Sequence, residues 1–210
     1  MLKLSRLQTS KSTNNINMIE IFGDYIIELP MREEYLIIGF SPSSVPLKQR
    51  WRNNGLSADF LADYLTTFFP RSEENPDSID KQIEIKSAVG YIANELLENA
   101  MKFNDENSSH PISIQLYLEP DKIIFCTTNS VNPQKVKKFQ EYITELINED
   151  PSELYIRQLE NNAIDDNCTH SRLGYLTMMN DYMAKIGWKF ETVQKETKVI
   201  TVTTMVQLLV

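Results

Sequence analysis

The sequence predicts an α+β fold in which helices pack against paired β-strands. A long amphipathic helical pattern ends near residue 104. Further along the chain, segments 112–126 and 188–209 each contain two strand-like runs joined by a short turn. Strands joined in this way pair antiparallel, and the apolar face of a long helix must be covered by a sheet or by another helix. The 210 residues, 41% of them apolar, suffice for one large domain with a packed core.

The first quarter of the chain predicts a polar tail, two strands and a helix. Residues 1–16 are rich in Ser, Asn and Lys, so we expect a flexible N-terminus. Apolar runs at 25–29 and 35–40 predict the strands. Ser57 is a suitable N-cap for a helix that ends at Pro70. The apolar face of this helix consists of Phe60, Leu61, Tyr64, Leu65 and Phe68.

The long helix starts at Asp77 or Ser78, and its apolar residues have the i, i+3, i+4, i+7 spacing of a core-facing helix. They are Val89, Ile92, Ala93, Leu96, Leu97, Ala100 and Met101. Glu95, Asn99 and Lys102 project within about 60° of one another at the rim of this face. A carboxylate, an amide oxygen and an ammonium so placed suit a cation and a phosphate chain. On spacing alone, the same three residue types are more often those of a solvated helix face.

The second half of the chain predicts a hairpin, three helices and a second hairpin. The first hairpin joins 112–118, which alternates in polarity, to the apolar run 123–126. The three helical patterns cover residues 133–148, 152–163 and 171–186. Gly187 is expected to end the last helix in a left-handed cap. The second hairpin joins 188–194 to 199–209.

Composition excludes several classes of partner. The net charge of −8 would repel a nucleic-acid backbone. Neither a signal-peptide pattern nor an apolar stretch of about 18 residues is found, so we expect a cytoplasmic protein without membrane contact. Cys126 and Cys168 do not form a disulfide framework. Cys168 and His170 offer only two ligands, which is weak evidence for a metal site.

Glu95, Asn99 and Ala100, followed by Lys102 and Phe103, resemble the N box of the GHKL ATPase superfamily, whose members have the Bergerat fold. A Glu with an Asn-Ala pair four residues later is most similar to the anti-sigma-factor serine/threonine kinase branch. In that family the Asn coordinates Mg²⁺ and the Glu is the general base. The resemblance therefore implies those roles for Asn99 and Glu95, with ATP or ADP and Mg²⁺ as ligands.

The order helix, two strands, variable insert, helix, two strands is also that of the GHKL core after its N box. The resemblance implies a two-layer α/β sandwich of the Bergerat type, with helices on one face of a mixed, mostly antiparallel sheet. Residues 17–210 would form a single ATP-binding domain. Within it, 17–77 would be an N-terminal strand and helix extension, and 130–170 a lid-like insert.

A second motif, SRLGYLTMMNDY at 171–182, resembles the Gly-x-Gly-Leu helix start whose backbone amides contact phosphate in the anti-sigma-factor kinases. Gly174 matches the second glycine, and Leu173 precedes it. Arg172 stands where the first glycine belongs, and its guanidinium would either bind phosphate or fill the space of the nucleotide. Gly174 has an alternative role in a close contact between helix and sheet.

The sequence departs from the family after the first hairpin. Asn129 occupies the position of an Asp that reads the adenine amino group, and it keeps a carbonyl acceptor there. Val131 and Pro133 replace two glycines. Between Gly90 and Gly174 the chain has no glycine at all, so a flexible glycine lid is missing.

Three further stretches, 40–44, 49–57 and 173–191, resemble a group of cyanobacterial-type, SiaB-like regulators. This resemblance implies a partner-switching signalling module with a STAS-like anti-anti-sigma-type protein and a PP2C-type phosphatase. The cluster Arg50, Trp51 and Arg52 suits a protein interface, or else a solvated loop with one buried indole.

The leading interpretation is an ATP- or ADP-binding regulator that binds a STAS-like partner and phosphorylates it on Ser or Thr. The alternative is a catalytically degenerate pseudokinase that acts as a protein- or ligand-binding module. A third is an unrelated α/β domain with a fortuitous N box. Related kinases often form a homodimer, and the last strand, up to Val210, either completes the sheet or meets another subunit.

Overall fold

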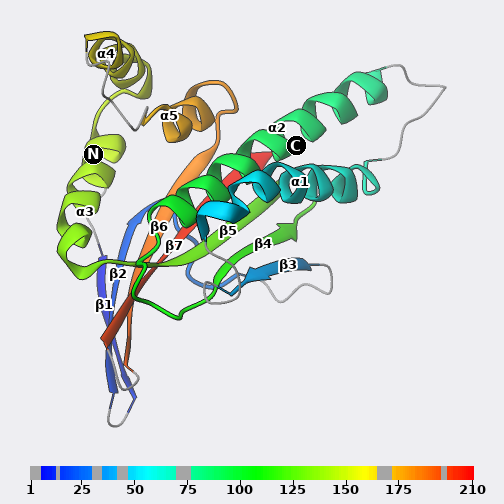
Figure 1. Cartoon of the computed structure of the whole chain (residues 1–210). Helices are drawn as coiled ribbons and strands as arrows, with labels where there is room; N and C mark the ends of the chain where they lie inside the picture. Colours follow the sequence, from blue (N-terminus) through cyan, green and yellow to red (C-terminus); the bar gives the residue numbers. More distant parts are fainter. Residues whose placement is uncertain are drawn as a thin grey trace.

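The computed structural model describes residues 6–12, 15–29, 35–41, 47–69, 77–164, 172–194 and 198–210. These residues form a seven-stranded sheet in the order β1-β2-β6-β7-β5-β4-β3. Figure 1 shows the helices on one side of it. The strands are β1 Arg6–Ser12, β2 Asn15–Gly23, β3 Tyr35–Phe40, β4 Ile112–Leu118, β5 Lys122–Val131, β6 Lys185–Gln194 and β7 Lys198–Leu209. The helices are α1 Leu47–Thr66, α2 Asp77–Lys102, α3 Pro133–Asn148, α4 Pro151–Ile164 and α5 Leu173–Asn180.

The α+β class is confirmed, but the expectation of a mixed sheet is wrong, since every described pair of neighbouring strands is antiparallel. Hairpins account for three of these pairs. Between β3 and β4, helices α1 and α2 run out and back (Figure 1), so Phe40 at the end of β3 pairs with Ile112 at the start of β4. The last strand, β7, lies between β6 and β5 and thus completes the sheet.

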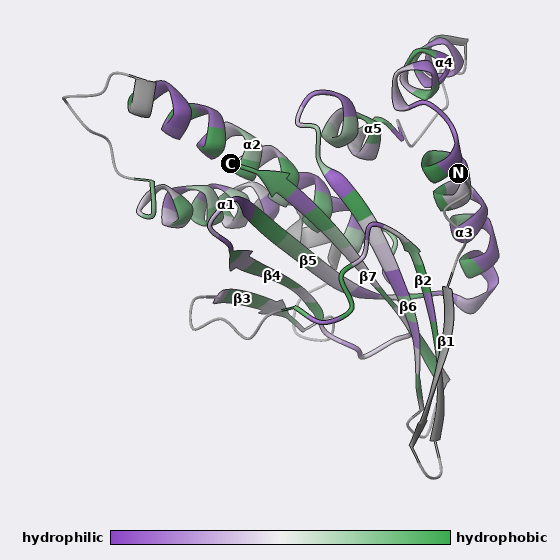
Figure 2. Ribbon diagram, turned by 180° about the vertical axis from the view of Figure 1, so that it is seen from behind, coloured by the Kyte–Doolittle hydropathy of each residue, from purple (hydrophilic) through white to green (hydrophobic). Residues whose placement is uncertain are grey.

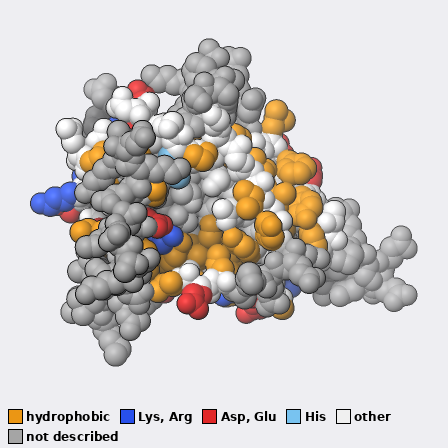
Figure 3. Space-filling model, turned by 90° about the horizontal axis from the view of Figure 1, so that it is seen from below, with side chains coloured by type: hydrophobic (Ala, Val, Ile, Leu, Met, Phe, Trp, Pro, Cys, Tyr) orange, Lys and Arg blue, Asp and Glu red, His pale blue; other side chains and the backbone are white. Residues whose placement is uncertain are grey.

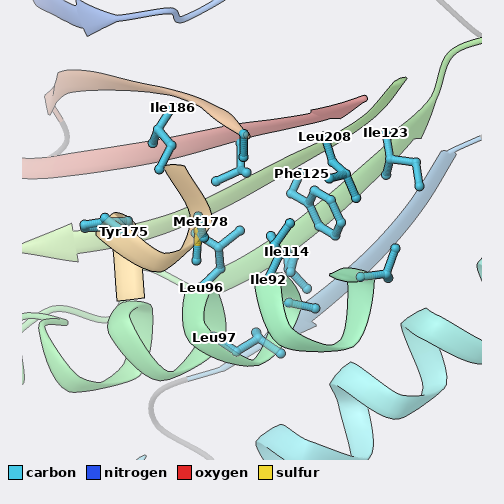
Figure 4. Close-up of a cluster of buried hydrophobic side chains, with 14 of the residues drawn as sticks. Ile92, Leu96, Leu97, Ile114, Ile123, Phe125, Tyr175, Met178, Ile186 and Leu208 are labelled. Atoms are coloured by element: carbon cyan, nitrogen blue, oxygen red, sulfur yellow. The ribbon is translucent and has the colours of Figure 1, made fainter. Parts of the chain in front are cut away.

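Helix α2 carries the main core contact. All seven apolar residues predicted for its inner face are at most 5% exposed. Figure 4 shows Ile92 and Leu96 directed at Ile114 and Phe125 on β4 and β5, and Figure 2 shows β5, between β7 and β4, as a hydrophobic strand. Burying each large aliphatic side chain stabilises the fold by roughly 1.5–3 kcal/mol. This packing fixes which side of α2 remains for polar residues.

Helix α1 starts at Leu47, well before the predicted N-cap Ser57, which lies inside the helix. The predicted inner face is also partly wrong, because Phe60 and Tyr64 are exposed. The buried positions are Ala58, Leu61, Ala62 and Leu65. Two of these are alanines, which let α1 pack closely against α2 and turn the two aromatic rings toward solvent.

The helix predicted over 171–186 is wrong in its second half. Helix α5 ends at Asn180, Met183 has a left-handed φ of 51°, and β6 begins at Lys185. Gly187 therefore lies within a strand and is not a helix cap. A Cβ on Gly187 would overlap the backbone of Tyr25, so the close approach of these two segments is what requires glycine.

The strand predicted at 25–29 is absent, because β2 occupies Asn15–Gly23 and ends in a left-handed turn at Gly23 with φ of 65°. Residues 24–29 cross the face of the sheet opposite the helices. Tyr25, Ile26 and Leu29 pack there against a cluster of Ile124, Cys126 and Met205. Figure 3, which views the molecule from below, shows hydrophobic side chains on this face.

The N-terminal segment 1–16, expected to be a flexible tail, contributes strand β1, which pairs with β2 from Arg6 opposite Ile21 to Ser12 opposite Asn15. In the middle of the chain, α3 and α4 confirm the predicted helices. They make up most of the predicted insert 130–170, and Figure 1 shows α4 as the helix farthest from the sheet. Among the described helices, none is long and apolar enough to cross a membrane.

Replacement of Gly23 by alanine should destabilise the fold. Its left-handed backbone costs a residue with a Cβ roughly 1–2 kcal/mol. The new Cβ would also lie 2.5 Å from the carbonyl oxygen of Ile186. We expect urea denaturation to give a loss of at least about 1 kcal/mol for Gly23→Ala. Gly39→Ala is the control, since nothing lies within 4 Å of its Cβ position. Equal losses in both variants would contradict the strand-ending role of Gly23.

Candidate functional site

A cavity of about 480 Å³ lies between α2, α3, the start of α5 and strands β5 and β7. This size is within the range of small-molecule sites. Six of the residues predicted to bind nucleotide line it, namely Glu95, Asn99, Lys102, Asn129, Arg172 and Gly174. Leu173, also predicted, is the first residue of α5 but does not line the cavity.

The end of α2 is attached to the end of β5 by a buried asparagine that sequence reasoning missed. The Asn104 side-chain oxygen accepts hydrogen bonds from the backbone N–H of Ser130 at 3.1 Å and from its hydroxyl at 2.8 Å. The backbone N–H of Asp105 donates to the Ser130 carbonyl at 3.1 Å. These bonds hold the end of α2 at a fixed position along β5, beside Asn129.

Glu95 projects from α2 toward the first turn of α5. A Cβ on Gly174 would overlap the Glu95 carboxylate, so the absence of a side chain at Gly174 makes room for it. The close contact at Gly174 is thus between two helices, and not between helix and sheet as the sequence alternative had it. Figure 4 shows the same approach further along α5, where Met178 lies above Leu96.

Burial raises the pKa of the Glu95 carboxyl above its ordinary value of 4.5, because the charged form loses contact with water. The neighbouring carboxylate of Glu98 raises this pKa further, and the Lys102 ammonium lowers it in part. A carboxylate whose pKa is raised is a stronger base for a hydroxyl proton than an exposed one.

Arg172 immediately precedes α5 and has a left-handed backbone, with φ of 55° and ψ of 15°. Its guanidinium lies over the ring of Tyr142 on α3, 5.5 Å from the ring centre. The Tyr142 hydroxyl donates to the Arg172 carbonyl oxygen at 3.1 Å. Burial raises the pKa of Tyr142, so this hydroxyl keeps its proton at neutral pH. Arg172 is therefore attached to α3.

The sheet side of the cavity offers polar groups among apolar ones. The Asn129 amide nitrogen donates to the Ser130 carbonyl at 2.8 Å, and within the described residues its side-chain oxygen accepts no hydrogen bond. Thr127 lies two residues before Asn129 on the same face of β5, and its buried hydroxyl has no partner either among these residues. Val131 and Val202 add apolar surface beside them. A flat ring with hydrogen-bonding edges fits such a surface.

Two lysines of α3, Lys135 and Lys138, also line the cavity and were not predicted. The signal available in the sequence was their spacing of three, together with Phe139 and Tyr142 at the following cavity-lining positions of the same helix. That spacing predicts that the four side chains share one face of the helix, but it does not predict which part of the protein this face contacts.

The remaining predicted residues lie, in whole or in their side chains, outside the described part of the chain. The backbone of Arg50, Trp51 and Arg52 lies in the first turns of α1, and their side chains lie outside the described part of the chain. Cys168 and His170 are outside it as well. Among the residues that are described, no three His, Cys, Asp or Glu side chains gather as a metal site.

No protein-family model matches this chain, and no curated protein does either. The assignment of a function therefore rests on the fold and on the cavity.

Replacement of Glu95 by glutamine should change how stability depends on pH. The raised pKa means that the folded state binds the Glu95 proton more tightly than the unfolded state does. The wild type therefore loses stability as pH rises from below 4.5 through the raised pKa, and Glu95→Gln removes this loss. We expect the stability of the variant relative to the wild type to increase with pH over this interval. Urea denaturation from about pH 4 to pH 8 measures it.

Glu160→Gln, on an exposed position of α4, controls for the loss of one negative charge. A stability difference between Glu95→Gln and the wild type that does not vary with pH would show that the Glu95 carboxyl is as well hydrated in the folded protein as in the unfolded chain.

Two replacements of Arg172 separate its backbone from its charge. Arg172→Gly and Arg172→Ala both remove the guanidinium, but only glycine adopts the left-handed backbone at no steric cost. In urea denaturation, we expect the free energy of unfolding of the glycine variant to be about 1 kcal/mol higher than that of the alanine variant. Equal values would mean that the start of α5 relaxes when the arginine is removed.

Proposed function

We propose that this protein is an ATP- or ADP-binding cytoplasmic regulator with a Bergerat-type fold, of the anti-sigma-factor kinase class. The observation that supports this most strongly is the convergence of residues distant in sequence on one cavity. An N box that arose by chance on a solvated helix would give no reason for Asn129, Arg172 and Gly174 to line the same cavity as Glu95.

The purine binds at the sheet side of the cavity. Its amino group donates to the Asn129 side-chain oxygen, and a ring nitrogen pairs with the Thr127 hydroxyl. The Thr127 hydroxyl is buried without a partner within the described residues, so a ligand that satisfies it removes a desolvation cost of roughly 1–3 kcal/mol. The Asn129 side-chain oxygen accepts no hydrogen bond from these residues and is left for the ligand. Val131 and Val202 provide apolar surface beside the ring.

The phosphates bind between α2 and the start of α5. Lys102 and Arg172 neutralise their charge, and the backbone amides near Gly174 donate to them. Mg²⁺ would be held by the Asn99 amide oxygen together with phosphate oxygens, and it supplies further neutralisation of the phosphate charge. A single protein ligand fits this ion, which is commonly bound through a few protein oxygens and the phosphates of its substrate.

For transfer to a protein, Glu95 accepts the proton of a Ser or Thr hydroxyl of the partner. The hydroxyl oxygen bonds to the γ-phosphorus while the bond from that phosphorus to the β–γ bridging oxygen breaks, and ADP leaves. The chemical class of partner is a STAS-like protein within a partner-switching module, with a PP2C-type phosphatase to reverse the modification.

A second candidate function is a pseudokinase that binds nucleotide or another ligand without turnover. Arg172 favours it, because a side chain in a left-handed conformation, attached to Tyr142, stands where kinases of this class have a glycine. Val131 and Pro133 favour it too, since they leave this region without the backbone freedom of glycine.

Calorimetry with Mg-ATP and Mg-ADP tests the proposed nucleotide site. We expect both to bind to the wild type, and we expect Asn99→Ala to abolish the gain in affinity that Mg²⁺ gives. Asn161→Ala, on the exposed surface of α4, is the matched control and should bind as the wild type does. Failure of the wild type to bind either nucleotide would refute the nucleotide site.

Phosphotransfer separates the kinase from the pseudokinase. A candidate STAS-like partner is incubated with radiolabelled Mg-ATP and either the wild type or Glu95→Gln. We expect label on the partner with the wild type and a loss of at least about 100-fold with the variant, the usual contribution of a general base. Tight nucleotide binding with no Glu95-dependent transfer would assign the chain to the binding-module class.

A further inference from the structure

One face of α3 forms a wall of the cavity. Lys135, Lys138, Phe139 and Tyr142 follow one another at i, i+3, i+4 and i+7, and all four line the cavity. The first two are cations and the last two are aromatic. Since Asn104 joins the end of α2 to Ser130 just before α3, the cationic turns of α3 lie toward the Lys102 end of the cavity. The aromatic turns lie toward Arg172 and Glu95.

The helix that carries the two lysines is fixed in place at both ends. Its first turn is capped by the Asn132 side chain, which accepts a hydrogen bond from the backbone N–H of Gln134 at 2.9 Å, and Pro133 occupies the first turn. Further along, Ile143 and Leu146 are buried in the core. The lysines are thus presented by a structured helix that begins directly after β5, where the related kinases have a glycine-rich lid.

The three lysines of this helix differ in their surroundings. Lys137 is 89% exposed and lies 4.0 Å from Glu141, with which it forms an i,i+4 ion pair away from the cavity. Among the described carboxylates, none forms an ion pair with Lys135 or Lys138. Both lysines that face the cavity therefore lack an anionic partner in this part of the chain.

The charge of the cavity is opposite to that of the protein. Four cations line it, Lys102, Lys135, Lys138 and Arg172, against two carboxylates, Glu95 and Glu98. The chain as a whole has a net charge of −8. A concave, positively charged site in an acidic protein concentrates anions there.

We propose that Lys135 and Lys138 bind the phosphate groups of the ligand and so replace the missing glycine lid. This inference rests on the proposed nucleotide site and names what gives that site its selectivity. Ligands with two or three phosphates bind much more tightly than those with one or none, because two ammonium groups on a fixed helix wall need several anionic oxygens to satisfy them.

The test is a series of ligands of decreasing charge, ATP, ADP, AMP and adenosine, measured by calorimetry on the full chain. Each charge-assisted contact corresponds to about a tenfold change in affinity. We expect Lys135→Ala and Lys138→Ala each to weaken ATP binding about tenfold and the double variant about a hundredfold, with adenosine unaffected. Increasing salt should weaken ATP binding to the wild type more than to the double variant.

Lys137→Ala is the matched control, since it removes the same charge from the same helix outside the cavity. If the lysine variants bind ATP no worse than Lys137→Ala does, the phosphate role is refuted while the nucleotide site stands. The lysines are exposed, so unchanged thermal unfolding should accompany the loss of affinity.

Inorganic tripolyphosphate separates this inference from the proposed function, because it carries the charge without the purine. Binding of tripolyphosphate that depends on Lys135 and Lys138 supports the lysine site even if ATP and adenosine fail to bind, an outcome that would refute only the nucleotide assignment. Absence of binding by every ligand in the series would refute both.

Discussion

The burial of one face of α2 against β4 and β5 is the constraint on which the rest of the structure depends. Seven residues of that face are excluded from water, so rotation of the helix about its axis would expose several of them at once. The rotation of α2 about its axis is thereby fixed, and so is the position of the polar residues at the edge of the face. Glu95, Asn99 and Lys102 are half-buried or exposed beside the sheet because Leu96, Leu97 and Ala100 are fully buried in it. A functional site here is a consequence of core packing.

Two small contacts shape the cavity along this polar edge. Asn104 ties the end of α2 to Ser130, and Gly174 lets the start of α5 approach Glu95. Neither contact contributes much apolar area. Both instead satisfy or accommodate a polar group at a position where a mismatch would leave a buried donor or a clash. The helices thus border an open cavity lined in part by charged side chains, although the core beneath it is an ordinary apolar one.

Features that follow from a local periodic pattern were predictable from the sequence. Features that depend on contacts between residues distant in the sequence were not. The inner face of α2 was predictable because a period of 3.6 residues persists over several turns. The end of α5 was not predictable, because methionine gives no signal for the left-handed backbone that Met183 adopts. Strand β6 begins at Lys185, three residues before the start at Trp188 that the sequence predicted. Lys135 and Lys138 were missed because the direction of α3 is set by Ile143 and Leu146 against the core. Asn104 acts on a residue 26 positions away.

The carboxylate of Glu95 bears most directly on whether the cavity serves transfer or only binding. Fixed cations on α3 stabilise a bound polyphosphate whether or not a reaction follows, so they favour neither function. Glu95 has the opposite effect, because its negative charge opposes phosphate binding and its burial, which raises its pKa, costs stability in the folded protein at neutral pH. A protein that only binds anions would gain from a neutral side chain at this position. If the cations of the cavity bind phosphate as proposed, the half-buried carboxylate against Gly174 therefore favours proton transfer over binding alone.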